Sequence, residues 1–200
     1  MASNFKIFLA YTLSALSVAY ISDLVLFHEG LFIEFYEKQV TNDVLQKIID
    51  IRQKWKWMGY AAIPLLTIVK SFLITLCLYA GIYLLNYTVS ISKIVRVVLL
   101  SEFIFLIPPV IKLIWFGFIR TEYSLVDLQY FMPLSTLQLF EPTDVQNWLI
   151  YPLALLNVFE IAYWIVLSWL LSREIKQQFD SAFQLVSSTY GIGLFLWIVM

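Results

Sequence analysis

The chain has 200 residues, of which 61% are hydrophobic and 14% are charged, with a formal net charge of -1 at pH 7. Its mean hydropathy is +0.81. A soluble or disordered chain of this length does not carry so much apolar surface. The single cysteine excludes a disulfide scaffold, and the lack of a basic excess excludes a nucleic-acid binder.

Five apolar runs divide the chain, each long enough to cross a bilayer core as a helix of about 20 residues. The runs are 5–27, 58–86, 97–119, 149–171 and 181–200. They predict an all-α fold, a polytopic transmembrane helical bundle with five spans plus an amphipathic interfacial helix. We expect a single membrane domain, residues 1–200, whose main partner is the lipid bilayer.

The first run, 5–27, also has the position of a secretory signal peptide. Its apolar stretch exceeds the usual length of about 7–15 residues, which favours a first span. Ala10, Ser14 and Ser17 recur on one side of this helix. Such a smooth side is typical of helix–helix contacts in lipid.

Residues 28–57 form a polar connection with five acidic and five basic side chains. Its apolar positions recur at helical spacing: Val44, Ile48, Ile51 and Trp55. This pattern predicts an amphipathic helix near 41–57 that lies on the membrane surface, or alternatively one that docks into a partner protein. The predicted interface anchors are Trp55, Lys56 and Trp57, since indole rings and lysine stems favour the headgroup level.

Three prolines within the apolar runs predict irregular helices in the middle of the chain. Pro64 lies in the long run 58–86, which must tilt or kink to fit a bilayer. Pro108 and Pro109 predict a kink in the run 97–119 because neither supplies a backbone N–H. Residues 120–148 mix apolar and acidic side chains, which indicates an interfacial loop with short helical turns, or alternatively a re-entrant segment.

The basic residues suggest an orientation. With five spans, one side holds Lys6, Lys93, Arg96, Arg173 and Lys176, and the other holds Lys38, Lys47, Arg52, Lys54, Lys56 and Arg120. The first set is concentrated in short connections, whereas the second is spread over long ones. Because basic residues in short loops favour the cytoplasm, we expect a cytoplasmic N-terminus in a cell membrane, here a bacterial inner membrane.

Few residues in this sequence can carry chemistry. His28 is the single histidine and Cys77 the single cysteine. No phosphate-binding loop, zinc-protease motif, nucleophile elbow or paired metal-ligand set occurs in the sequence. We therefore predict no catalytic residues, no cofactor, no metal and no enzymatic activity.

Two charges within the apolar runs are the most informative residues. Lys70 lies twelve residues past Met58 and Glu160 eleven past Leu149, and both runs start from the same side. At about 1.5 Å per residue they reach similar depths, which predicts that they approach each other directly or through Asn157, Tyr163 or water. Glu102 and Lys112 are expected nearer the ends of their run.

The predicted cluster of Lys70, Glu160, Asn157 and Tyr163 has two interpretations. It is either a static bridge that fixes which helices are neighbours, or a relay for protons, ions or a substrate. One lysine and one glutamate are few for a pathway, which favours the static bridge.

The C-terminal part resembles a known family. Residues 155–167 (LLNVFEIAYWIVL), a short charged turn and the run from Val186 to Trp197 resemble the closing helix pair of bacterial members of the Yip family. Residues 133–137 (PLSTL) resemble their pre-helix stretch, so the likeness covers about 130–200. It implies five spans and a cytoplasmic N-terminus. Eukaryotic members act in vesicle trafficking and bind small GTPases; a chain that resembles the bacterial members need not do so, and no catalytic residues accompany the family.

The sequence favours a non-catalytic scaffold or accessory subunit that packs against other membrane protein subunits. The alternative is a small permease or ion-coupled carrier built around Lys70 and Glu160. A membrane-embedded enzyme is a third reading, which would need a reactive group that the sequence does not display.

Overall fold

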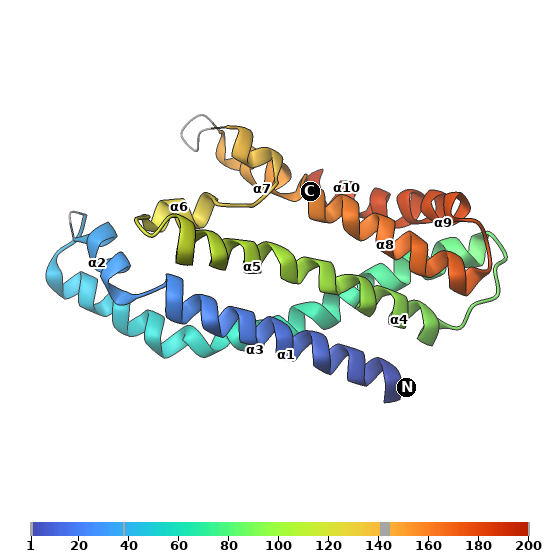
Figure 1. Ribbon diagram of the computed structural model, residues 1–200, viewed down its shortest axis with the longest axis horizontal. Helices are drawn as coiled ribbons and strands as arrows, with labels where there is room; N and C mark the ends of the chain where they lie inside the picture. Colours follow the sequence, from blue (N-terminus) through green and yellow to red (C-terminus); the bar gives the residue numbers. More distant parts are fainter. Residues whose placement is uncertain (1, 38, 141–144, 200) are drawn as a thin grey trace.

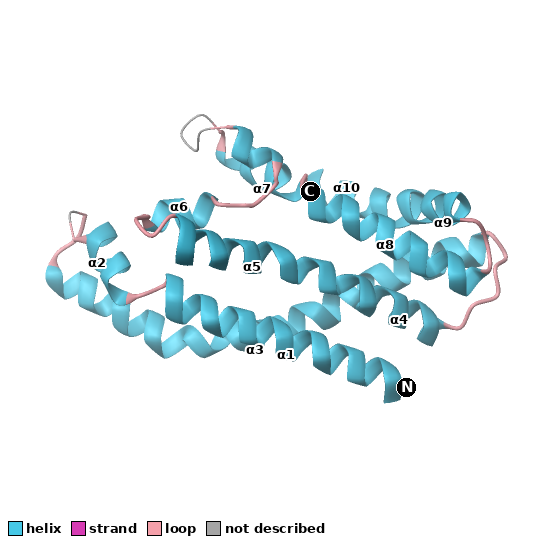
Figure 2. Ribbon diagram, viewed as in Figure 1, coloured by secondary structure: helices cyan, strands magenta, loops and turns pink. Residues whose placement is uncertain are grey.

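The computed structural model describes residues 2–37, 39–140 and 145–199. These residues form helices joined by turns, and no strand occurs among them (Figure 2). The expected all-α class is therefore confirmed for the described part of the chain.

Three helical stretches are long and apolar enough to cross a membrane, judged by length and composition. They are Ser3–Leu26, Asn42–Leu84 and Ile91–Ile119. The first two are α1 (Ala2–Leu26) and α3 (Asn42–Leu84), and the third starts with α4 (Ile91–Ser101). All three extend along the long axis of the molecule and contact one another (Figure 1).

α3 is one continuous helix of 43 residues. It contains both the region near 41–57 and most of the predicted span 58–86, so the expected boundary at residue 58 is absent. The reason is local: no glycine or proline occurs between Asn42 and Met58 to end the helix. At about 1.5 Å per residue α3 is about 65 Å long, roughly twice the thickness of a bilayer core. The surface position of its first half stays a prediction.

The third stretch begins earlier than expected and changes its helical type. It consists of α4, the 3₁₀ segment η1 (Glu102–Leu106), α5 (Ile107–Ile114) and the π segment η2 (Trp115–Ile119). Pro108 and Pro109 lack the N–H groups that would bond to the carbonyls of Ile104 and Phe105. The irregular turn therefore lies just before the two prolines, at η1.

The predicted span 149–171 is not a single helix, which corrects the expectation. α7 (Asn147–Leu155) ends before Asn157, and α8 (Val158–Ile175) begins after it. Asn157 Oδ1 accepts the N–H of Glu160 at 2.8 Å, and this N-cap starts a new helix. The Thr136 N–H donates to Leu156 O at 2.9 Å, so the preceding loop occupies the break.

The last apolar run stays helical from residue 179 to 199. It comprises α9 (Phe179–Val186), the π segment η4 (Ser187–Gly191) and α10 (Ile192–Val199). α8 and α9 are antiparallel neighbours, joined by a turn at Lys176 with left-handed backbone (φ 55°).

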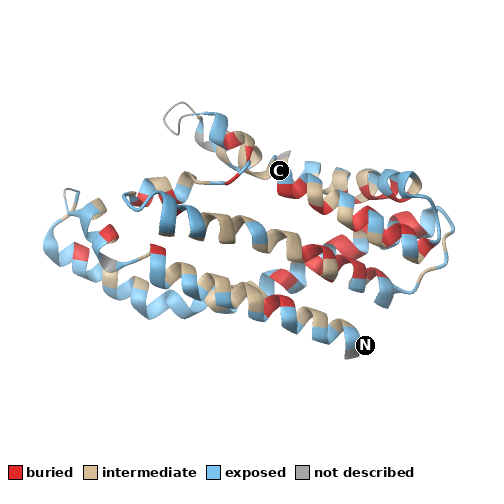
Figure 3. Ribbon diagram, in the orientation of Figure 1, coloured by how far each residue is buried: buried red, intermediate tan, exposed pale blue. Residues whose placement is uncertain are grey.

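The buried side chains gather where α3, α4, α8, α9 and η4 meet, in one half of the molecule (Figure 3). A smaller core at the other end joins α1 to the short helices α2 (Glu29–Tyr36) and α6 (Leu125–Tyr130). Its members are Leu26, Leu31, Phe116, Leu125 and Leu128. Helix α2 lies in the connection 28–57, where no helix was expected before residue 41.

The segment 120–148 contains the short helical turns that the sequence indicates, α6 and the 3₁₀ turn η3 (Thr136–Leu139). Ser124 and Asp127 cap α6 reciprocally. The hydrogen bonds from Ser124, together with Arg120 at 3.1 Å, hold the pKa of Asp127 below its usual range. Lys112 donates to the Leu128 carbonyl oxygen and joins α5 to α6. The contact of this loop with the membrane stays a prediction.

Candidate functional site: a polar cluster within the helix bundle

Lys70 and Glu102 form an ion pair midway along the α3–α4 hairpin. Lys70 Nζ lies 2.9 Å from Glu102 Oε2. Lys70 is fourteen residues before the end of α3 and Glu102 is eleven residues after the start of α4. Both therefore lie about 17–21 Å from the hairpin turn, near the middle of a bilayer-spanning helix.

The two partners differ in burial. Only 2% of the Glu102 side chain is exposed, against 39% of the Lys70 side chain. The Lys70 ammonium nitrogen lies 3.5 Å from the centroid of the Phe105 ring, a favourable cation–π contact. Leu66 and Leu73, one turn to either side of Lys70, are exposed. This face of α3 is therefore open on the outside of the bundle.

Glu160 is engaged by two aromatic donors. Its Oε1 accepts the Tyr190 hydroxyl at 2.6 Å and the Trp164 Nε1–H at 3.0 Å. Tyr190 comes from η4, and Gly191 next to it lets η4 approach α8. A Cβ at Gly191 would lie 2.5 Å from the Trp164 ring. The Trp164–Glu160 contact therefore depends on a glycine at this position.

Tyr163 connects the two carboxylates. Its side chain is fully buried, and its hydroxyl donates to Glu102 Oε1 at 3.2 Å. Its ring centroid lies 5.5 Å from that of Tyr190, whose hydroxyl bonds to Glu160. We call this set the central polar cluster: Lys70, Glu102, Glu160, Tyr163, Trp164 and Tyr190.

Lys70 and Glu160 were expected to approach each other directly or through Asn157, Tyr163 or water, and the direct contact is not formed. Among the described residues, the ion pair of Lys70 is with Glu102, and Tyr163 provides the link toward Glu160. Asn157 caps α8, and its amide group donates to the carbonyls of Ala154 and Leu155. Of the four predicted residues, Lys70, Glu160 and Tyr163 belong to the cluster and Asn157 does not.

Glu102, Trp164 and Tyr190 are the cluster members that the predicted set did not include. Placing the third span at 97–119 put Glu102 near a helix end, whereas the helix starts at Ile91. Ser90 precedes that start with extended backbone, and a serine before a periodic apolar run signals a helix N-terminus. With that start, Glu102 lies near mid-span, at a depth similar to that of Lys70.

The predicted interface anchors lie at the opposite end of the molecule from the N-terminus. Trp55 and Trp57 are exposed on α3. Lys56 forms an ion pair with Asp23, near the end of α1. The Asp23 carboxylate also accepts the Tyr60 hydroxyl at 2.8 Å. Their contact with a headgroup region stays a prediction.

The geometry of the cluster favours holding helices together. Its ion pair and hydrogen bonds join α3, η1, α8 and η4. None of its members lines the cavity of about 430 Å³ that lies between α1, α3 and α4. In the described part of the chain, no group of three or more His, Cys, Asp or Glu side chains is arranged to hold a metal ion.

Comparisons with models of protein families, with curated proteins and with solved structures found no match. The resemblance to the Yip family therefore stays a prediction from residues 130–200.

Proposed function

We propose that this protein is a non-catalytic integral membrane protein that acts as a scaffold or accessory subunit of a larger membrane assembly. The observation that carries the proposal is the exposure of Lys70. Lys70 lies about 21 Å from the end of α3, near mid-membrane for a span that starts at the hairpin turn, yet 39% of its side chain is exposed. Ionisable residues within spans almost always face protein or a water-filled cavity. A second subunit that covers Lys70 meets this requirement.

The energetic reason for a partner is the cost of leaving the lysine against lipid. On insertion scales a lysine at a helix centre costs about 2.5–3.5 kcal/mol. Lysine has three N–H donors, and Glu102 accepts one of them at 2.9 Å. A partner helix with a hydrogen-bond acceptor would engage the ammonium group, while Leu66 and Leu73 supply apolar contact.

The double variant Lys70→Met, Glu102→Gln tests this proposal. It removes both charges together and leaves a carbonyl oxygen to accept the Tyr163 hydroxyl, so the chain stays folded. Removing one partner of a buried pair would instead cost about 3–5 kcal/mol. On native gels of mild-detergent extracts, we expect the wild type in a complex larger than the monomer and the double variant as a monomer.

Lys176→Gln is the matched control, because it removes an exposed cation at the end of α8, far from Lys70 along the bundle. It should leave the complex intact. A wild type that migrates as a monomer, or a double variant that stays in the complex, contradicts the accessory role.

A second proposal, a small permease or ion-coupled carrier, is favoured by the charge balance of the cluster. The cluster contains two carboxyl groups, those of Glu102 and Glu160, and one ammonium group, that of Lys70. A bound proton or a second cation would make the cluster neutral. Proton flux into proteoliposomes that contain only this protein, lost in Glu160→Gln, would support the carrier and defeat the accessory role.

We also propose five spans and a cytoplasmic N-terminus in a bacterial inner membrane. α8 and the run 179–199 pack in the same core as α3 and α4, and at about 27 and 31 Å they approach the thickness of a bilayer core.

The orientation rests on five basic residues that share one end of the bundle: Lys6, Lys93, Arg96, Arg173 and Lys176. Two contacts support this placement: Asn4 donates to Ser92 O at 2.7 Å, and Lys93 pairs with Glu174 at 2.8 Å. Membership of the Yip family implies the same topology.

A further inference from the structure

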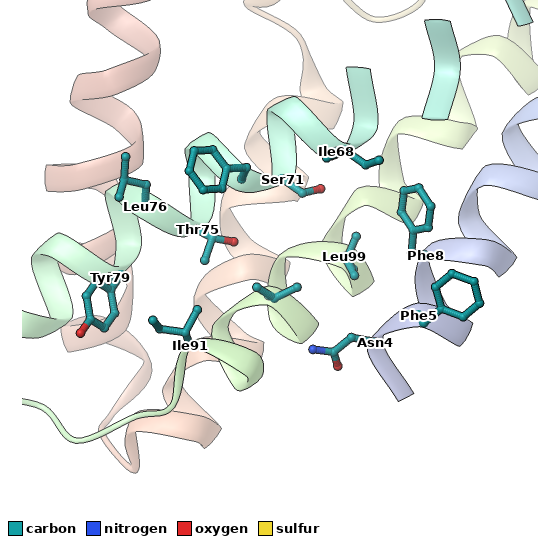
Figure 4. Close-up of a pocket in the computed structure, with 12 residues that line it drawn as sticks. Asn4, Phe5, Phe8, Ile68, Ser71, Thr75, Leu76, Tyr79, Ile91 and Leu99 are labelled. Carbon is teal, nitrogen blue, oxygen red and sulfur yellow. The ribbon is translucent and has the colours of Figure 1, made fainter. Parts of the chain in front are cut away.

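An apolar groove lies between the three helices of span length. It has a volume of about 430 Å³ and is bounded by α1, α3 and α4 (Figure 4). Phe5 and Phe8 come from α1, Ser71 and Thr75 from α3, and Val95 and Leu99 from α4. Phe5 and the neighbouring Phe72 are exposed. The groove therefore opens sideways, toward the lipid that surrounds such helices.

Ser71 and Thr75 line this groove with small side chains. Both side chains are 6% exposed, and both hydroxyl groups lack a hydrogen-bond partner in the described part of the chain. The buried hydroxyl of Ser168 in α8 also lacks a partner, whereas Thr67 and Ser101 donate to the carbonyl one turn earlier. Figure 4 shows the Ser71 and Thr75 side chains directed into the groove.

The groove is long and its lining is apolar. Along α3 it extends from Ile68 to Tyr79, about 16 Å at about 1.5 Å per residue. Because hydrocarbon chains surround spans in a bilayer, an elongated apolar groove on the outside of a span suits one acyl chain of a lipid.

Two cations without an ion-pair partner are close in the sequence to residues that line the groove. Lys6 is two residues after Asn4, and Arg96 directly follows the groove residue Val95. Both are exposed, and none of the ion pairs among the described residues involves either one. Cations at the ends of spans attract anionic lipid headgroups, and arginine binds phosphate oxygens through several N–H donors.

We propose that this groove binds an anionic phospholipid. One acyl chain lies between α1 and α3 against Ser71 and Thr75, and the phosphate group contacts Arg96 and Lys6. This site is independent of the Lys70 face and of the accessory role proposed above.

Native mass spectrometry of the full chain in detergent tests the site with two added lipids of equal chain length, phosphatidylglycerol and phosphatidylcholine. We expect one phosphatidylglycerol to be retained at a concentration about tenfold lower than phosphatidylcholine. Arg96→Gln should abolish that preference. Thr75→Leu, which fills the groove, should weaken retention of both lipids about tenfold, and Ser71→Leu is a second filling variant. Glycerol phosphate, a headgroup without chains, should not compete.

Ala80→Leu is the control for added bulk, because Ala80 is exposed on α3 and does not line the groove. It should retain lipid as the wild type does. Equal retention of the two lipids by the wild type, or unchanged retention in both filling variants, overturns the proposal. So does a photo-crosslink from Leu76 to another polypeptide in native membranes, which would place a partner helix in the groove.

Discussion

Glu160 shows how a buried carboxylate can serve as a hydrogen-bond acceptor and not as half of an ion pair. Its Oε1 accepts both the Tyr190 hydroxyl and the Trp164 indole N–H. Both donors are large aromatic side chains in the centre of the bundle. The stabilising role of Glu160 therefore depends on an oxygen at this position more than on its charge.

Glu160→Gln and Glu160→Leu separate these two contributions. Glutamine keeps an oxygen for both donors, so we expect a loss of less than about 1 kcal/mol in the free energy of unfolding. Leucine leaves two donors unsatisfied, at about 1–3 kcal/mol each. Unfolding in mixed micelles, titrated with an anionic detergent, measures the difference. Equal losses in the two variants would show that the charge is what matters.

Sequence reasoning identified Lys70 and Glu160 because a charge stands out within an apolar run, but it did not find the partner of Lys70. Matching charges by depth requires both helix ends to be known. An error of six residues at the start of the third stretch moves Glu102 by about 9 Å along the helix. Hydropathy defines such ends poorly, because Lys93 and Arg96 lower the apolar signal in the first turns of α4.

Among the helices, the packing of α3 against η4 depends on Gly81. A Cβ at this position would lie 2.5 Å from Thr189 Cγ2. Thr189 cannot easily turn away, because its hydroxyl donates to Leu185 O at 2.7 Å. A larger residue at Gly81 therefore forces the two helices apart or breaks that hydrogen bond.

Gly81→Ala should accordingly lower the free energy of unfolding by about 1–3 kcal/mol, the usual cost of overpacking a core. Gly59→Ala on the same helix is the control. No atom lies within 4 Å of a Cβ at Gly59, so alanine there should raise stability by about 0.5–1 kcal/mol. Thermal unfolding in detergent compares the two variants, and a shift of the same sign in both would refute this account of α3 packing.

At the level of helices, hydropathy predicted the apolar stretches well and their continuity poorly. α3 runs through residue 58 because an amphipathic stretch and an apolar stretch have the same helical backbone preference. The fourth run breaks at Asn157 because an asparagine cap and a loop bonded to Leu156 outweigh apolar composition. The π segments η2 and η4 have no hydropathy signal.

For the whole molecule, exposed apolar surface is not by itself an argument for a partner. Much of α1 and of the first half of α3 is exposed (Figure 3), and lipid covers such surface without cost. The argument for a partner rests on a charge, because lipid offers no acceptor for the N–H groups of Lys70 that Glu102 does not engage. Composition predicts the lipid environment from sequence, whereas the open face around Lys70 emerges only when the helices are placed side by side.

Site-specific photo-crosslinking from two adjacent residues of α3 tests most directly whether a protein covers Lys70. Leu65 and Leu66 are 62% and 63% exposed, so they are matched in accessibility, but only Leu66 lies one turn from Lys70 on the same face. With a photoreactive residue at each position in native membranes, we predict adducts with another polypeptide from position 66 and lipid adducts alone from position 65. Lipid adducts alone from position 66, or equal protein adducts from both, would contradict the account.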